Sequence, residues 1–535
     1  MITYAQKSRV ALLMQSIRRT TNTIRQQKLQ CRAICNNYTA YGIRSGLACR
    51  HNSQYNVPFT SEMRPEIKRG HFRSISEADI EFFRVLCSGR VLTDIHDLDV
   101  YNIDWMRSCR GKSPVVLKPK TTDELSEIMK YCNDNRLAVV PQGGNTSLVG
   151  GSVPVFDEVV VSLELMNKIL HVDPLMGSLV CEAGCILETL NQHLATYELM
   201  MPLDLGAKGS CHIGGNIATN AGGMRVLRYG SIHANLLGLE VVLANGDVMD
   251  FMSVLRKDNT GYDLKHLFVG SEGTLGIITK AAILCPVLPK STQVAFLGVA
   301  EFEIVLQILR RAKTQLADIL SAFEFLDMQA LSLVQNQLNL RNPISRNRFY
   351  VLLEVSGSNA NHNEEKLTAF LEELLSAEIV SDGTIAADES KMKNIWSVRE
   401  RLAEAQRHAG YSYKYDVSLP LKHMYKPVEV MRAKLKDKVD VCVGYGHVGD
   451  GNLHLNLTTK EYDSSVVAEI EPFLFEVVSK YDGSISAEHG LGVKKNNYIR
   501  YSKSDSAVKL MKDMKKMLDP NGILNPYKTL PTYDL

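Results

Sequence analysis

The chain has 535 residues, which is too long for a single hydrophobic core and predicts about two to four domains. Apolar residues make up 45% of it and charged residues 22%, as in ordinary globular proteins. The formal net charge is +2, but residues 1–61 contain nine Lys or Arg and no Asp or Glu, so the remaining 52 basic and 59 acidic groups have a net charge of −7. A mildly acidic body argues against a nucleic-acid partner.

The N-terminal residues 1–60 have the composition of a mitochondrial transit peptide, which would direct the chain to the matrix. They are basic, free of acid and rich in Ser, Thr, Asn and Gln. Val10, Leu13, Met14 and Ile17 recur at helical spacing among several arginines, so an amphipathic helix is expected there. A basic tail without a targeting role is the alternative. No run of about 18 apolar residues occurs, so no membrane span is expected.

A helical entry segment and the start of an α/β domain are expected next. Residues 61–112 form a short, mostly helical entry segment. A strand is expected at 115–119 and another at 137–140, and the helix between them begins after the N-cap Thr121, with Glu124 completing a capping box. Strand, capped helix, strand and glycine loop is a typical α/β beginning.

Three domains are expected after the leader and the entry segment. Short strands and Gly/Asn turns continue to residue 290, which gives a first domain over 113–290. Alternating strands and long helices, such as 364–376, predict an α+β domain over 291–430. Residues 431–535 form a C-terminal domain with a hairpin and a terminal helix near 508–518.

Three segments rich in glycine and small polar residues occur at 141–147, 209–216 and 270–277. Glycine lets backbone N–H groups approach a pyrophosphate, and runs of small residues leave room for a flat ring. None of the segments matches the dinucleotide or P-loop patterns. Each alone is typical of a tight turn, but together they predict a bulky, phosphate-bearing cofactor.

A pair of histidines predicts a metal site in the C-terminal domain. Asp450-Gly451 favours a two-residue type I′ turn, a register that places His447 directly opposite His454. Directly opposed side chains on one face have Cβ atoms about 5 Å apart, which suits two nitrogens on one ion. Glu488 would complete a His₂Glu set with one open coordination position. A hydrogen-bonded core pair with an unrelated surface acid is the alternative.

Longer motifs carry a resemblance to a known family. The glycine-rich segments, with Pro-x-Gly-Gly-Asn-Thr at 141–146 and Gly-Ser-Glu-Gly-Thr-Leu-Gly-Ile at 270–277, resemble the FAD-binding domain of the vanillyl-alcohol oxidase/p-cresol methylhydroxylase superfamily. His-x-Gly-Asp-Gly-Asn-x-His at 447–454 and Glu-His-Gly at 488–490 resemble its D-2-hydroxyacid dehydrogenase branch. The resemblance covers about 113–528. It implies an α+β fold with a two-part FAD-binding domain, an α+β substrate cap and a small C-terminal helical segment.

The resemblance also implies how the cofactors are held. Asn145 occupies the position at which relatives with covalently attached FAD often have histidine, so a non-covalent FAD is implied. The implied metal ligands are His447, His454 and Glu488, with Zn²⁺ as the expected ion and Mn²⁺ or Co²⁺ as alternatives. The expected cofactor-binding residues are Gly143, Gly144, Asn145, Thr146, Ser147, Gly214, Gly215, Asn216, Glu272, Gly273 and Ile277.

Chemistry and the resemblance together assign the substrate residues. Hydride loss to a flavin requires a base for the hydroxyl proton, and His489 is the candidate. Arg399 and Lys414 resemble the cations that bind the distal carboxylate of D-2-hydroxyglutarate in this branch, and Asn456 is a further candidate contact. Solvated helix charges and a hairpin amide are the alternatives. Related enzymes have a hydroxyl-bearing residue four positions after the arginine, where this chain has Ala403.

The predicted function is FAD-dependent, metal-assisted oxidation of D-2-hydroxyglutarate to 2-oxoglutarate. Because no nicotinamide site is visible, electrons are expected to leave through another carrier, and the resemblance implies electron-transfer flavoprotein. A D-lactate or glycolate dehydrogenase of the same branch is the alternative, and a zinc hydrolase with structural glycine loops is the alternative of a different class. The oligomeric state stays open, with a homodimer as one option.

Overall fold

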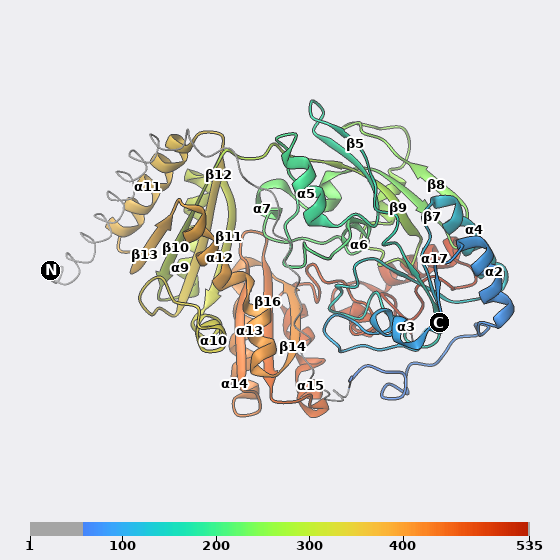
Figure 1. The fold of residues 1–535 in the computed structure, drawn as a ribbon. Helices are drawn as coiled ribbons and strands as arrows, with labels where there is room; N and C mark the ends of the chain where they lie inside the picture. The colour runs from blue at the N-terminus through green and yellow to red at the C-terminus, as the bar shows by residue number, and fades with distance from the viewer. Residues whose placement is uncertain (1–56, 533–535) are drawn as a thin grey trace.

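The computed structural model describes residues 57–532, which form three sheets with their helices (Figure 1). The predicted transit peptide lies almost entirely outside the described residues. Two α-helices occur in the predicted entry segment, and no described helix has the length and apolar character needed to cross a membrane. The helices of this segment are α2 (Glu77–Cys87) and α3 (Ile95–Asn102).

The first sheet begins where the α/β domain is predicted. It has four strands in the order β1-β2-β4-β3, and β2, β4 and β3 are parallel. Thr121 caps α4 (Thr122–Asp134) by accepting from the backbone N–H of Glu124, as expected, and the apolar stripe of this helix is buried. The strands are β1 (Val91–Leu92), β2 (Val116–Leu117), β3 (Val139–Gln142) and β4 (Val159–Ser162).

The second sheet is antiparallel, with five strands in the order β5-β6-β9-β7-β8. It shares one hydrophobic core with the first sheet. Its strands are β5 (Ile169–Asp173), β6 (Ser178–Glu182), β7 (Leu236–Val242), β8 (Val248–Phe251) and β9 (Ile277–Leu284). Its helices are α5 (Leu187–Ala195), α6 (Ile213–Ala218), α7 (Val226–Tyr229), α8 (Ile232–Asn235) and the 3-10 helix η1 (Leu264–Leu267).

The third sheet forms the cap, on the left of Figure 1, and has seven antiparallel strands in the order β13-β10-β12-β11-β15-β16-β14. The strands are β10 (Ser291–Val299), β11 (Leu320–Asp327), β12 (Phe349–Gly357), β13 (Asp382–Ala386), β14 (Tyr411–Ser418), β15 (Val441–His447) and β16 (Asn452–Thr459). The helices are α9 (Phe302–Gln315), α10 (Met328–Leu338), α11 (Ala360–Ser376), α12 (Glu389–Glu400), α13 (Leu402–Ala409), η2 (Leu421–His423), α14 (Lys426–Leu435), α15 (Ser464–Ile470) and α16 (Phe473–Lys480).

The hairpin β15–β16 belongs to this cap sheet, so the boundary expected near residue 430 does not separate two folding units. Because β15 pairs with β11 and β16 with β14, the hairpin is hydrogen-bonded on both sides within the sheet. The chain then returns to the first domain. It forms η3 (Asn496–Tyr501) and α17 (Asp505–Leu518). Beyond α17, the carbonyl of Ile523 accepts from the backbone N–H of Val139 on β3 at 2.8 Å.

The predicted register of this hairpin is wrong by two residues. His447 pairs with Asn452, and His454 pairs with Tyr445, because the four-residue connecting loop (448–451) is centred one residue before the predicted Asp450-Gly451 turn. Gly451 has a positive φ of 85°, but Asp450 does not have the positive φ that a type I′ turn requires. A shift of two residues keeps every side chain on its face, so the two histidines are diagonal neighbours on one surface.

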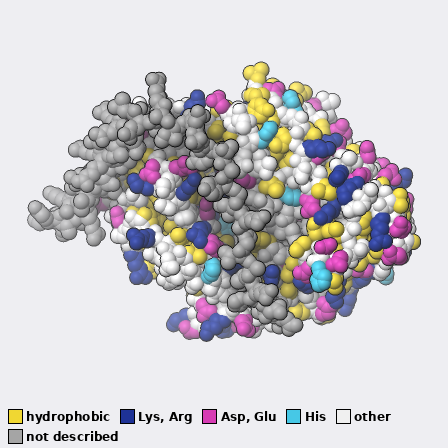
Figure 2. Space-filling model, in the orientation of Figure 1, with side chains coloured by type: hydrophobic (Ala, Val, Ile, Leu, Met, Phe, Trp, Pro, Cys, Tyr) yellow, Lys and Arg dark blue, Asp and Glu magenta, His cyan; other side chains and the backbone are white. Residues whose placement is uncertain are grey.

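Basic and acidic side chains are interspersed over the coloured surface of Figure 2.

Candidate functional site

A cavity of about 700 Å³ lies between the glycine-rich segments and one face of the cap sheet. All of the residues expected to bind cofactor, substrate or metal line this cavity. They are Gly143, Gly144, Asn145, Thr146, Ser147, Gly214, Gly215, Asn216, Glu272, Gly273, Ile277, Arg399, Lys414, His447, His454, Asn456, Glu488 and His489. The structure therefore brings all of these predicted residues to one continuous cavity.

The glycine-rich wall is built by close approach of backbone segments. A Cβ on Gly144 would lie 1.9 Å from the carbonyl oxygen of Ser210, and a Cβ on Gly214 would lie 2.6 Å from the Cβ of Ala183 and 3.0 Å from its carbonyl oxygen. Neither position has room for a side chain. Gly215, in contrast, has no heavy atom within 4 Å of its Cβ position and leaves the cavity open.

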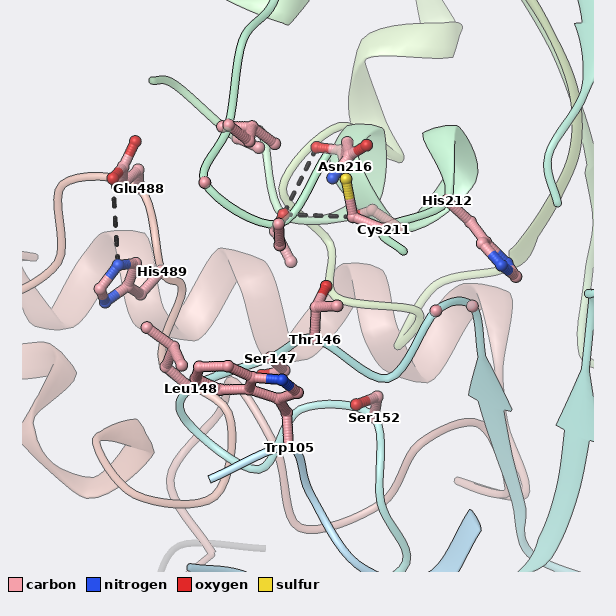
Figure 3. A pocket seen from close by; sticks show the side chains of 18 of the residues that line it. Trp105, Thr146, Ser147, Leu148, Ser152, Cys211, His212, Asn216, Glu488 and His489 are labelled. Carbon is pink, nitrogen blue, oxygen red and sulfur yellow. Dashed lines mark hydrogen bonds and ion pairs between the residues drawn. The ribbon is translucent and has the colours of Figure 1, made fainter. Parts of the chain in front are cut away.

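Two buried polar atoms on this wall lack a partner among the described residues. They are Oδ1 of Asn216 and Nδ1 of His212, on side chains that are 6% and 9% exposed. Burial lowers the pKa of His212, so its imidazole stays neutral. Because buried polar groups are normally hydrogen-bonded, these atoms fit a wall that contacts a polar cofactor. In Figure 3, His212 lies on the opposite side of the pocket from Glu488 and His489.

Two of the expected cofactor residues use their side chains elsewhere. Asn145 donates to the carbonyls of Val100 and Ile103, and the carboxylate of Glu272 accepts from the backbone N–H groups of Leu491 and Gly492 at 2.8 and 2.7 Å. Glu272 thereby connects the first domain to the loop that follows His489. Both residues line the cavity, but their side chains are hydrogen-bonded within the protein.

The opposite wall is the polar face of the cap sheet. Lys414 and Asp416 lie two residues apart on β14. On β16, Asn456 is the direct partner of Lys414, and His454 is the direct partner of Asp416. The residues between them, such as Tyr415 and Leu455, pack in the apolar core on the other face. The strand period of two therefore separates the chemistry from the core.

Three ligand atoms converge at one point of this wall. The Nε2 atoms of His447 and His454 are 3.4 Å apart, and Oε1 of Glu488 lies 3.9 and 3.7 Å from them. Tetrahedral ligands at metal bonds of about 2.0–2.1 Å are separated by about 3.3 Å. The arrangement therefore fits a divalent cation with little adjustment.

The protonation states of these three groups also suit a cation. Burial lowers the pKa of His454 to about 3, so this imidazole is neutral. Burial disfavours the charged form of His447, but the Glu324 carboxylate, 2.6 Å from Nδ1, outweighs it and raises the pKa of His447 to about 10. Burial would raise the pKa of Glu488, but the nearby imidazoles lower it to about 2. A cation at Nε2 of His447 would take the place of its proton.

Asp416 is a functional residue that sequence reasoning missed. Its Oδ2 accepts from three successive backbone N–H groups, those of Ala487, Glu488 and His489, at 2.9–3.0 Å. Its Oδ1 accepts from Asn452, and the residue is fully buried. Its alternation with Lys414 along one strand was the available signal.

A second set of possible ligands overlaps the first. Asp416, His454, Glu488 and His489 each offer a ligand atom, and these atoms lie within 4.8 Å of one another. Both oxygens of Asp416 already accept hydrogen bonds, so it is better suited to fix the loop than to bind an ion. The other oxygen of Glu488 accepts from the backbone N–H of Gly223 at 2.7 Å, which orients this carboxylate from the first domain.

His489 faces the same point from the opposite side. Its Nε2 lies 3.9 Å from Oε1 of Glu488, the contact dashed in Figure 3, and its ring is parallel to that of His454 at 5.8 Å. The side chain is 20% exposed, so one ring nitrogen can exchange a proton with the cavity.

Four cationic residues line the cavity, and two of them are the predicted substrate residues Arg399 and Lys414. Arg399, on α12, is 8% exposed and has its guanidinium 4.8 Å from the ring centroid of Tyr445. No carboxylate among residues 57–532 forms an ion pair with Lys414, and burial lowers the pKa of this lysine to about 8. Asn456 donates to Tyr445 and to Gln406, which fixes its amide beside Lys414.

Trp105 is another cavity residue without a role in the sequence-based prediction. It comes from the entry segment, and its ring is 5.8 Å from Nζ of Lys414 and 5.3 Å from the Arg407 guanidinium. No local pattern marks a single tryptophan in a loop as part of a site 300 residues away.

Comparisons with known proteins agree with this geometry. An FAD-binding domain family matches residues 113–251, and a family of FAD-linked oxidase C-terminal domains matches 288–529. The first match contains two of the glycine-rich segments, so it argues against a zinc hydrolase in which these loops are purely structural.

Relatives and solved structures are similar over most of the chain. Mitochondrial D-2-hydroxyglutarate dehydrogenase of Danio rerio is 55% identical over 86% of each chain. The D-2-hydroxyglutarate–pyruvate transhydrogenase of Saccharomyces cerevisiae is 44% identical over 88% of this chain and 98% of its own. p-Cresol methylhydroxylase with bound substrate has the same fold, with a TM-score of 0.69, 17% identity and coverage of 86% and 99%. The chain therefore belongs to the D-2-hydroxyglutarate dehydrogenase family of FAD-linked oxidases.

Proposed function

We propose that this protein oxidises D-2-hydroxyglutarate to 2-oxoglutarate with FAD and a divalent cation. The observation that carries the proposal is the single cavity in which the FAD-type glycine wall faces a His₂Glu cluster, an imidazole and two cations. A five-carbon 2-hydroxy diacid has a group for each of these contacts. A 2-hydroxy monoacid such as D-lactate or glycolate has no distal carboxylate for the cations.

Arg399 and Lys414 bind the distal carboxylate in this proposal. A guanidinium offers a planar fork, and an ammonium adds a point charge. Lys414 lies directly across from Asn456 in the register, so both act on the same part of the substrate. Ala403 also lines the cavity, without a hydroxyl to contribute.

His447, His454 and Glu488 would hold the cation, which would lower the pKa of a hydroxyl placed beside it. Two neutral nitrogens and one carboxylate leave a net positive charge, which suits an α-hydroxy carboxylate. Zn²⁺ is the proposed ion because of the ligand types and their spacing.

His489 accepts the hydroxyl proton as the substrate loses two electrons. Asp416 fixes the backbone of His489 and so positions this imidazole. FAD held by the glycine wall would supply the acceptor for the hydride from C2 of the substrate. One proton and one hydride are lost in total, which converts the alcohol to the ketone.

Reduction of the bound flavin by added acids tests the proposal. D-2-hydroxyglutarate should bleach the flavin absorbance at micromolar to millimolar concentrations, and D-lactate or glycolate should require much higher ones. Equal efficiency for D-lactate would favour the shorter-acid alternative. No bleaching by any D-2-hydroxy acid would contradict the proposal.

Electron-transfer flavoprotein is the proposed acceptor, and the mitochondrial matrix is the proposed compartment. The name of the Saccharomyces relative supports a different route, in which pyruvate takes the electrons. Mixing the substrate-reduced enzyme with either acceptor distinguishes the two, because only the true acceptor restores the flavin colour rapidly.

A further inference from the structure

Glu324 joins the two ends of the proposed substrate site. Its Oε1 lies 2.6 Å from Nδ1 of His447, and its Oε2 accepts from Nε of Arg399 at 2.8 Å. One carboxylate therefore contacts a proposed metal ligand and a proposed substrate cation.

The position of Glu324 in the sheet makes these contacts rigid. Glu324 and His447 are direct partners in the β11–β15 register, so their side chains leave the same face side by side. Glu324 is 1% exposed and does not line the cavity, so neither solvent nor ligand competes for its oxygens. A carboxylate buried to this degree is stable only with charged or hydrogen-bonding partners.

The contact with Glu324 also orients the guanidinium of Arg399. Of the three guanidinium nitrogens of Arg399, only Nε donates to an acceptor among the described residues. The ring of Tyr445 lies against the guanidinium. The terminal nitrogens are therefore left for a ligand in the cavity. A guanidinium fixed through Nε presents these two nitrogens in a defined direction.

We propose that Glu324 is a positioning residue that fixes the His447 imidazole and the Arg399 guanidinium in one frame, and so sets the separation at which a diacid is bound. The inference rests on the proposed function, because it assigns Glu324 to the metal end and the distal end of that substrate. It also accounts for a buried Glu between Phe323 and Phe325 in β11.

The test compares Glu324→Gln with Glu354→Gln in the FAD-loaded enzyme. Glu354 is the matched control, because it lies on the neighbouring strand β12 and contacts Ser321 and Trp396 but neither site residue. A glutamine there still accepts from Trp396. Zn²⁺ affinity is measured by competition with a chelator, and flavin reduction gives kcat and KM for D-2-hydroxyglutarate.

Glu324→Gln should weaken Zn²⁺ binding by about 10–100-fold, because an acceptor on the outer nitrogen of a metal-binding imidazole supports affinity to that extent. KM should rise about tenfold or more, since a buried hydrogen bond between charged groups is lost. Saturating Zn²⁺ should then restore kcat but leave KM high. Glu354→Gln should keep all three values.

Unchanged Zn²⁺ affinity in Glu324→Gln would overturn the proposal. Recovery of KM together with kcat at saturating Zn²⁺ would also overturn it, because Glu324 would then act through His447 alone. Failure of the proposed function itself is visible earlier, as a wild-type enzyme that binds no Zn²⁺ or is not reduced by D-2-hydroxyglutarate.

A double variant keeps the test possible if the single variant does not fold. Glu324→Gln with Arg399→Met removes both charges of the buried pair, so no unpaired buried charge remains. Its Zn²⁺ affinity should still fall about 10–100-fold below that of Arg399→Met alone. Equal affinities of the two variants would overturn the proposal.

Discussion

The two walls of the cavity are built on opposite principles. The wall formed by the glycine-rich segments works through missing side chains, which let backbone from 141–147 and 209–216 approach within contact distance. The wall formed by the cap sheet works through side chains that project from β14, β15 and β16 on one face. The first wall should therefore be sensitive to added atoms, and the second to changes of charge and hydrogen bonding.

The largest effect is expected from a methyl group added to the glycine wall. Gly144→Ala would place Cβ 1.9 Å from the Ser210 carbonyl, a clash that must displace backbone. We expect a loss of at least about 1–3 kcal/mol in stability and poor retention of FAD. Gly215→Ala is the matched control, since nothing lies within 4 Å of its Cβ, and it should fold. Thermal unfolding and bound flavin per chain measure both effects, and equal stability of the two variants would contradict the difference between the walls.

The next effect concerns the imidazole of His489 on the polar wall. His489→Asn should slow flavin reduction by D-2-hydroxyglutarate about 10²–10⁴-fold, because the hydroxyl proton loses its acceptor. Zn²⁺ content, flavin content and substrate affinity should stay close to wild type, since His489 is outside the proposed ligand set. Rapid mixing under anaerobic conditions measures the rate. A variant that reacts at the wild-type rate would remove His489 from the proton transfer.

The smallest effect concerns the charge of Lys414. Burial lowers the pKa of Lys414 to about 8, below its ordinary value of 10.5, so its ammonium is present below pH 8 and is lost above it. KM for D-2-hydroxyglutarate should therefore rise several-fold to about tenfold between pH 7 and 9. Lys414→Arg should flatten this rise because a guanidinium stays charged. The same pH profile in both enzymes would show that another group titrates.

Local sequence was sufficient for the glycine wall because its structure depends on local backbone geometry. These segments line one cavity, and α4 begins at its predicted cap. The hairpin turn was placed wrongly, because Asp450-Gly451 favours a two-residue turn only when the flanking strands allow it. Here β15 and β16 are each also paired on their outer edges, and the loop that joins them has four residues, 448–451.

Sequence alone determined which residue types were available for the chemistry and on which face of their strands they lie. The two-residue error in register left His447 and His454 on one surface, because side chains alternate with a period of two. Only the tertiary structure decided which distant groups hold them. Glu324 lies on β11 and Asp416 on β14. No local sequence pattern links Glu324 to His447 or Asp416 to the loop at 487–489. Their partners follow from strand order in the cap sheet, which is set by packing over the whole domain.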